Sequence, residues 1–319
     1  HGRYFRHPWR KTLASTYPRS RLSSAFKSIH CKITTSLGLS LHRGLPIIVA
    51  LRQPATNGHI MNADLDALHP YPFEKLAALK ATLTPPTELA HIPLTIGEPQ
   101  HAPYPAALDA LVAHQLEMAR YPATNGLPAL REAIANWATQ RFQLRDLDSE
   151  QHVVPVNGTR EAIFAFVQAA LDRTRPAKVA APNPFYQIYE GAALLAGGEP
   201  LYLDCTAENN FRPDVNAVSA ETWREVQIVF ICSPGNPTGA VTPIEEFIIA
   251  SDECYSELYL DETAPPPGLL QACAELGRND YRRCVVFHSL SKRSNLPGLR
   301  SGFVAGDAAL LTPFKRYRT

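Results

Sequence analysis

The feature that most constrains the fold is a series of seven short apolar runs along residues 153–305, each of only three or four residues. Such runs, apolar on both faces, are typical of strands buried on both sides, as in a parallel sheet covered by helices. We expect strands at Val153–Val156, Val179–Ala181, Leu201–Leu203, Ile228–Ile231, Phe247–Ala250, Val285–Phe287 and Phe303–Ala305.

Helical patterns alternate with these runs. Gly126–Gln140 has apolar residues at 3-4-3 spacing from Leu127 to Trp137, and Pro128 lies in the first turn, where its missing N–H costs nothing. Thr159–Leu171 also places its apolar residues on one face. The alternation predicts a three-layer α/β/α domain around a mostly parallel seven-stranded sheet.

Composition excludes several classes of protein. No stretch approaches the ~18 consecutive apolar residues of a membrane-spanning helix. The 28 prolines argue against a helical bundle, and 19% charged residues are too few for a disordered chain. The six cysteines show no Cys-x-x-Cys spacing and the histidines are scattered, so we expect no metal site. Several cysteines lie inside apolar runs, and we expect them to be buried thiols of a protein in the reducing cytoplasm.

Residues 1–60 differ from the rest of the chain. They contain ten of the 31 Lys and Arg residues and none of the 30 Asp and Glu residues. Two interpretations stay open: a transit-like leader, or translated sequence upstream of Met61. The remaining chain is acidic, which argues against a nucleic-acid partner, because phosphate contacts need clustered positive charge.

The residues after four of the expected strands carry the chemistry. His288–Lys292 is a tight loop that ends in Lys292, and Arg300 follows eight residues later. A lysine held near another cation and partly desolvated has a depressed pKa and becomes a nucleophile toward an aldehyde. The alternative is an ordinary solvated surface lysine.

Two further loops supply partners for a heterocyclic ring. Asp252 ends the fifth strand, and a buried carboxylate there needs a positive partner such as a protonated pyridine. Tyr255 follows three residues on. In Ser233–Gly239, the amide of Asn236 can point at a ring oxygen, although the turn residues alone are typical of any loop.

The fourth loop is an anion cradle. Val153–Val156 is followed by Asn157 and Gly158, and Thr159 and Arg160 then open a helix whose free N–H groups favour a phosphate. This signal is weak alone. A phosphate cradle, an aldehyde-reactive lysine, a carboxylate for a pyridinium and a phenol–amide pair together describe one cofactor, pyridoxal phosphate.

At these residues the sequence resembles the fold-type I, pyridoxal-phosphate-dependent class I/II aminotransferases, from about Met61 to about Asp307. Within that family it is similar to bacterial N-succinyldiaminopimelate aminotransferases. The motifs come in family order. They are Asn-Pro-Thr-Gly, Ser-Asp-Glu-x-Tyr, Ser-Leu-Ser-Lys and an arginine eight residues after that lysine, with the longer strings at His69–Leu76, Val156–Phe166, Pro182–Gly191, Ala250–Tyr259 and Ser289–Asp307.

The resemblance implies a role for each matching residue. Lys292 would bind the cofactor aldehyde and later carry a proton, Asp252 would bind the pyridinium nitrogen, and Tyr255 and Asn236 would bind the ring hydroxyl oxygen. The other implied ligands are Tyr186 on the ring face (or a core aromatic residue), Thr159, Arg160, Ser289 and Arg300 at the phosphate, Tyr121 at the phosphate of the neighbouring subunit of a homodimer, and Gly97, with Asn236, in the substrate pocket.

The implied reaction is a ping-pong amino transfer between small-molecule amino acids and 2-oxo acids. Glutamate and 2-oxoglutarate form one pair, and N-succinyl-2-amino-6-oxopimelate and N-succinyl-diaminopimelate the other, on the route to lysine. Two alternatives stay open. One is a relative of other specificity (aspartate, aromatic or a carbon–sulfur lyase), and the other is an inactive cofactor-binding fragment.

The sequence also departs from the family pattern in two places. We expect residues 61–97 to form an N-terminal arm with part of a small domain, residues 98–319 to form the cofactor-binding large domain, and the C-terminal small domain with its carboxylate-binding arginine to be missing. After Gly239 only Ala240–Glu246 precede the next strand, too few for a parallel crossover with a helix, so we expect an internal deletion near 240–247.

Overall fold

A computed structural model describes residues 62–92, 95–240 and 248–319, which belong to one compact unit, Met61–Thr319. The leader at 1–60, the expected deletion and the first residue of the fifth expected strand, Phe247, lie outside the described residues. The divisions at residues 97 and 98 remain expectations.

All seven expected strands are present in one sheet, and the prediction of a mostly parallel sheet is confirmed. The order across the sheet is β1-β7-β6-β5-β4-β2-β3. β7 pairs antiparallel with both β6 and β1, and the remaining pairs are parallel. The strands are β1 Val153–Val156, β2 Lys178–Asn183, β3 Glu199–Asp204, β4 Val226–Cys232, β5 Ile248–Asp252, β6 Cys284–Ser289 and β7 Gly302–Gly306.

Six of the strands extend past the apolar runs at their carboxyl ends by one or two residues, and two of these extensions are central to the site. Asp252 is the last residue of β5 and Ser289 is the last of β6, and both are buried. The apolar runs end two residues earlier, at Ala250 and Phe287, because the side chains that follow them are polar. The functional groups therefore stand on the rigid sheet rather than in the loops that follow.

Helices cover both faces of the sheet. The two sequence-predicted helices are confirmed with shifted ends. The helices are α2 Pro72–Lys80, α3 Pro105–Ala113, α4 Pro128–Phe142, α5 Thr159–Ala170, α6 Ile188–Leu195, α7 Ala220–Glu225, α8 Leu269–Glu275, α9 Leu290–Arg293 and α10 Ala308–Tyr317, with short 3-10 turns η3 Ala63–Ala67, η4 Gln115–Ala119, η5 Ala207–Asn209, η6 Val215–Ala217 and η7 Pro297–Leu299.

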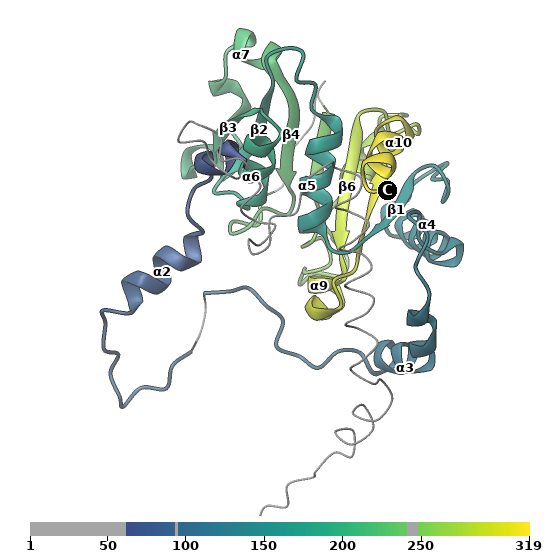
Figure 1. Cartoon of the computed structure of the whole chain (residues 1–319), viewed down its shortest axis with the longest axis horizontal. Coiled ribbons are helices and arrows are strands. Elements are labelled where there is room, and N and C mark those ends of the chain that lie inside the picture. Colours follow the sequence, from purple (N-terminus) through teal and green to yellow (C-terminus); the bar gives the residue numbers. More distant parts are fainter. Residues whose placement is uncertain (1–61, 93–94, 241–247) are drawn as a thin grey trace, which may run out of the picture. The chain divides into compact units, whose positions relative to one another are not determined.

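Two apolar cores lie on opposite faces of the sheet. In Figure 1, α5 crosses in front of the strands between α6 and α10, and these three helices bury the first core around Phe166, Phe230 and Phe287. The second core lies against α4 and α8 and includes Phe142 and Phe303. The three-layer α/β/α prediction is thus confirmed.

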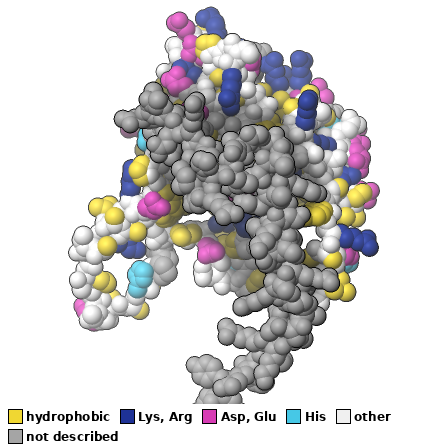
Figure 2. All heavy atoms as spheres, viewed as in Figure 1, with side chains coloured by type: hydrophobic (Ala, Val, Ile, Leu, Met, Phe, Trp, Pro, Cys, Tyr) yellow, Lys and Arg dark blue, Asp and Glu magenta, His cyan; other side chains and the backbone are white. Residues whose placement is uncertain are grey.

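The segment before α4 carries many exposed apolar side chains. Along α2 and the chain that follows it, Leu79, Leu83 and Ile92 are about 70% exposed, and hydrophobic atoms are visible on this segment in Figure 2. α3 exposes Leu111 and Val112 in the same way. A search of the described residues finds no helix with the length and hydrophobicity to span a membrane.

Phe166 provides a test of the first core. Its ring is fully buried and packs edge-on to Phe287 and Phe314 at 5.7 and 6.2 Å between centroids. Phe166→Ala leaves a cavity, and we expect it to lower the free energy of unfolding by about 3–5 kcal/mol in urea titrations. Leu276→Ala, at a 69% exposed position, is the control, with an expected change within about 0.5 kcal/mol. Equal losses in the two variants contradict this core.

Candidate active site

Polar residues from five strands meet at one edge of the sheet. β1, β2, β4, β5 and β6 all run toward this edge, and antiparallel β7 starts from it. The carboxyl ends of parallel strands are where ligands bind in such sheets. The residues that follow β1, β2, β4, β5 and β6 are those identified from the sequence as candidate ligands.

Asp252 is a buried charged group at this edge. Its carboxylate accepts from the Cys254 backbone N–H at 3.2 Å and from the Tyr189 hydroxyl at 2.9 Å. Burial raises the pKa of Asp252 above its usual value, and the bonds from Cys254 and Tyr189 oppose that change. None of the ion pairs within the described ranges includes Asp252. Among the described residues, the carboxylate therefore accepts from neutral donors and forms no ion pair.

Tyr255 and Asn236 form the expected phenol–amide pair. The Asn236 side-chain amide donates to the Tyr255 hydroxyl oxygen at 3.1 Å, across 19 residues of sequence. Burial, followed by the nearby charge of Asp252, raises the pKa of Tyr255 to about 12. The phenol therefore stays protonated at neutral pH and can donate to an oxygen anion in front of it.

The anion cradle has the expected local geometry. Gly158 caps α5 with φ of 98°, a conformation that favours glycine, and a Cβ there would collide with the Arg300 guanidinium. Arg300 thus lies against the N-terminus of α5, although in the sequence it comes just before β7. It also lies 3.6 Å from Glu161, but both side chains are at least half exposed, so this pair contributes little.

Thr159 and Arg160 occupy the first turn of α5. Thr159 is buried, and its hydroxyl lies 3.3 Å from the Cys254 thiol. Arg160 is exposed, and its charge acts on the Tyr186 phenol. The cradle is therefore in contact with the loop that follows Asp252.

Lys292 lies in the single turn α9 directly after β6. The Ser289 hydroxyl accepts from the Ser291 backbone N–H at 3.1 Å, which fixes this turn. The half-buried Lys292 amine donates to the backbone oxygen of Gly97, so the structure brings together the expected nucleophile and an expected substrate-pocket residue.

Tyr186 and Tyr121 differ in placement. Tyr186 follows β2 and is 43% exposed, with its ring edge-on to Tyr189 at 5.9 Å between centroids; burial raises the pKa of its phenol. Part of the Tyr186 side chain is thus open to a ligand. Tyr121 is fully exposed. Among the hydrogen bonds and ring contacts of the described residues, none connects Tyr121 with the other site residues.

Two residues of the site were missed from the sequence. Tyr189 is fully buried, stacks on Phe230 at 4.5 Å and donates to Asp252. Cys254 lies between Asp252 and Tyr255, and burial raises the pKa of its thiol far above the usual range. The spacing of Tyr189, three residues after Tyr186 at the start of a helix, was the available signal.

These residues fit pyridoxal phosphate. A buried carboxylate without a cation suits a protonated pyridine nitrogen, since each removes the other's cost of burial. The Gly158 cradle, with Arg300 against it, suits a dianionic phosphate. An amine, a phenol and an amide at the same edge complete the donor set.

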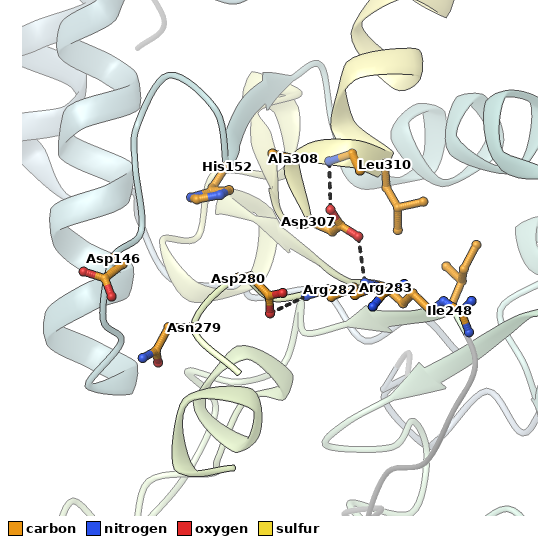
Figure 3. A pocket seen from close by; sticks show the side chains of 11 residues that line it. Asp146, His152, Ile248, Asn279, Asp280, Arg282, Arg283, Asp307, Ala308 and Leu310 are labelled. Carbon is orange, nitrogen blue, oxygen red and sulfur yellow. Dashed lines mark hydrogen bonds between the residues drawn. The ribbon is translucent and has the colours of Figure 1, made fainter. Parts of the chain in front are cut away.

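A separate hollow of about 810 Å³ lies at the opposite edge of the sheet (Figure 3). Its lining comes from the amino ends of strands, including Ile248 of β5 and Arg283 before β6. Asp307 accepts there from the Arg283 and Ala309 backbone N–H groups. None of the candidate ligands lines it. The described residues also contain no cluster of three side chains able to hold a metal ion.

Comparisons with known proteins identify relatives. A model of the family described as aminotransferase class I and II matches residues 90–318, more than half of the chain. The chain is 35% identical over 245 residues to an LL-diaminopimelate aminotransferase of Desulforudis audaxviator, covering 72% of this chain and 59% of that one. An LL-diaminopimelate aminotransferase of Nitratidesulfovibrio vulgaris is 32% identical, with coverages of 77% and 65%. The chain thus spans less than two thirds of these curated relatives.

Solved structures give the same fold. An aminotransferase from Neisseria meningitidis is 47% identical with a TM-score of 0.76, over 81% of this chain and 68% of that one. The aminotransferase AspB from Helicobacter pylori is 40% identical with a TM-score of 0.72, over 79% and 68%.

Asp252 predicts a pH dependence of stability in the cofactor-free chain. Between the usual pKa of 3.8 and the raised folded-state value, the folded chain binds more protons than the unfolded chain, so the free energy of unfolding falls as pH rises through that window. We expect Asp252→Asn to remove this fall, so its stability relative to the parent increases with pH in urea titrations from pH 4 upward.

Asp148→Asn is the matched control with the opposite sign. The Gln151 backbone N–H lowers the pKa of Asp148, so its contribution is present above pH 3.8 and is lost as pH falls further. An Asp252→Asn variant that follows the parent at every pH contradicts the assignment of a buried, unpaired carboxylate.

Proposed function

The chain belongs to the class I and II aminotransferases, which depend on pyridoxal phosphate, and from that premise we propose that it transfers an amino group between glutamate and an oxo acid of the diaminopimelate route. The observation that carries the proposal is the buried, cation-free carboxylate of Asp252 at the same sheet edge as Lys292. Asp252 ends β5 and Lys292 follows the neighbouring parallel strand β6, so a carboxylate for a ring nitrogen and an amine for an aldehyde lie at the carboxyl ends of adjacent strands.

Each polar group at the edge has a task in the proposed reaction. Bound pyridoxal phosphate supplies an electron sink for a carbanion formed at the substrate alpha carbon. Asp252 would hold the ring nitrogen in its protonated form. Lys292 would hold the cofactor aldehyde, and its amine would remove and return a proton at the substrate alpha carbon.

The surrounding residues orient the ring. The Tyr255 hydroxyl and the Asn236 amide, which are hydrogen-bonded to each other, would bind the ring hydroxyl oxygen, and the partly exposed Tyr186 would stack on the ring. Thr159, Arg160, Ser289 and Arg300 would hold the phosphate. Positioning of this kind is a large part of the rate enhancement in any two-substrate reaction.

We propose a homodimer with shared sites. Tyr121 is fully exposed in the single chain, and its assigned task is to reach the phosphate in the neighbouring subunit. The exposed leucines of α2 and the chain after it, and the exposed apolar side chains of α3, give this segment a surface suited to burial against a second copy.

The proposed oxo acid is N-succinyl-2-amino-6-oxopimelate. The strings at His69–Leu76 and Ser289–Asp307 support the N-succinyl form. The names of the similar curated proteins, LL-diaminopimelate aminotransferases, favour a second candidate, the unacylated substrate. Both share the diaminopimelate skeleton and differ at the distal nitrogen.

A comparison of kcat/KM on the whole protein separates the candidates. We expect N-succinyl-diaminopimelate to exceed LL-diaminopimelate by about tenfold or more with 2-oxoglutarate as acceptor, because a pocket built around an acyl group leaves polar groups unpaired when that group is lost. The reverse order supports the second candidate, and a preference for aspartate over both overturns the proposed route.

Lys292 tests the chemistry itself. We expect the chain to take up pyridoxal phosphate with a visible absorption band, and borohydride to fix the cofactor on Lys292, detected by peptide mass spectrometry. Lys292→Ala is expected to carry no label and to lose at least about 10²-fold in transamination. Lys315→Ala, on α10, is the control and keeps the label at Lys292. If borohydride fixes no cofactor on Lys292 of the parent protein, or if Lys292→Ala transaminates at the parent rate, the proposal is overturned.

A further inference from the structure

A second buried polar pair lies behind the candidate site, on the opposite face of the same strands. Glu253 directly follows Asp252, and His288 directly precedes Ser289, so the alternation of side chains along a strand sends them to the other face. His288 Nε2 lies 3.1 Å from Glu253 Oε2, and the two side chains are 3% and 2% exposed. We call Glu253 and His288 the rear pair.

The rear pair joins the ends of two strands to a helix. The Glu253 backbone N–H donates to the Phe287 oxygen at 2.9 Å, next to His288. The second carboxylate oxygen of Glu253 accepts from the Leu269 backbone N–H, at the start of α8, at 2.7 Å. Both oxygens of this carboxylate therefore have partners, and each partner belongs to a different element.

Aromatic contacts extend the same connection to the Lys292 turn. The His288 ring stacks on Phe303 at 4.9 Å between centroids and meets the edge of Trp137 at 5.3 Å. Arg293, the residue after Lys292, lies 4.0 Å over the same Trp137 ring. The residues beside Asp252, Ser289 and Lys292 thus converge on one cluster behind the sheet.

A buried polar pair is a poor source of stability, since apolar residues of the same volume often serve as well. Its directional bonds do fix distances between the elements it joins. Among the cofactor's expected contacts, Asp252 and Lys292 hold opposite ends of one rigid ring system, so their separation must match the ring. The alignment of such groups to within about 1 Å controls reaction rates.

We propose that the rear pair is a positioning device that sets the separation between the Asp252 carboxylate and the Lys292 amine. Glu253 and His288 touch neither cofactor nor substrate. They act through the ends of β5 and β6, and Arg293 on Trp137 transmits the same restraint to α9. This inference rests on the proposed function, because it assigns the pair to the same cofactor site.

His288→Phe is the sharpest test, because phenylalanine keeps the ring contacts with Phe303 and Trp137 and removes the ring nitrogens. We expect the dissociation constant of pyridoxal phosphate to rise about tenfold, a difference of about 1.4 kcal/mol. We also expect a shift in the pH midpoint at which the visible band of the bound cofactor changes, since that midpoint reports the surroundings of the Lys292 nitrogen. His288→Gln, which keeps an N–H toward Glu253, is expected to stay within about threefold of the parent.

Gln227→Leu is the matched control for loss of a buried polar link. The Gln227 side chain joins β4 to the backbone of Asp172, accepting at 2.8 Å and donating at 2.9 Å, near the opposite end of the strand. We expect it to lower the free energy of unfolding but to leave the cofactor dissociation constant within about twofold of the parent and the pH midpoint unchanged.

The outcomes separate the two proposals. If the parent chain takes up no pyridoxal phosphate, the proposed function falls and this inference with it. If the parent binds and His288→Phe retains both the parent dissociation constant and the parent midpoint, this inference alone is overturned. If His288→Phe does not fold, Arg293→Leu is the deciding variant, because it removes the contact between Arg293 and the Trp137 ring. A shift in the pH midpoint of the visible band supports the inference, and a midpoint equal to that of the parent overturns it.

Discussion

The carboxylate of Asp252 lies at the end of an interior strand with two neutral donors and, among the described residues, no ion-pair partner. Burying such a group costs free energy, which the hydrogen bonds from Cys254 and Tyr189 offset only in part, since the pKa of Asp252 stays above its usual value. The cost is recovered when a cationic ring nitrogen binds. The rest of the carboxyl edge can be understood from this constraint, because Tyr189, Cys254 and Glu253 all fix where that carboxylate stands. A sheet flanked by two apolar cores supplies the rigidity that the arrangement needs.

Most of the architecture could be predicted from the sequence because burial on both faces leaves a direct trace in apolar runs. All seven strands and both predicted helices exist. The ends of the strands could not be predicted in the same way. Asp252 and Ser289 belong to β5 and β6 although they are polar, since their partners come from other elements and not from periodicity.

The candidate site was predictable wherever a residue's chemistry is visible locally. Lys292, Asp252, Asn236 and Gly158 stand at the positions expected from their loops. Tyr189 and the rear pair were not predicted, because each acts through a contact 35 or more residues away in sequence. An aromatic or acidic residue inside an apolar stretch looks like ordinary core or surface until the fold brings its partner into contact.

Because β7 runs antiparallel to β6, the chain between these two strands is built differently from the other connections at the carboxyl edge of the sheet. The connections from β2 to β3 and from β5 to β6 leave the edge and return through helices α6 and α8 on the faces of the sheet. The connection from β6 to β7 instead stays at the edge, where the Leu290 N–H donates to the Ser301 oxygen. The amine of Lys292 and the guanidinium of Arg300 thus share one short, continuous piece of chain. Any change in the length of this connection would therefore move both cationic groups together, while the helical connections between the other strands stay the same.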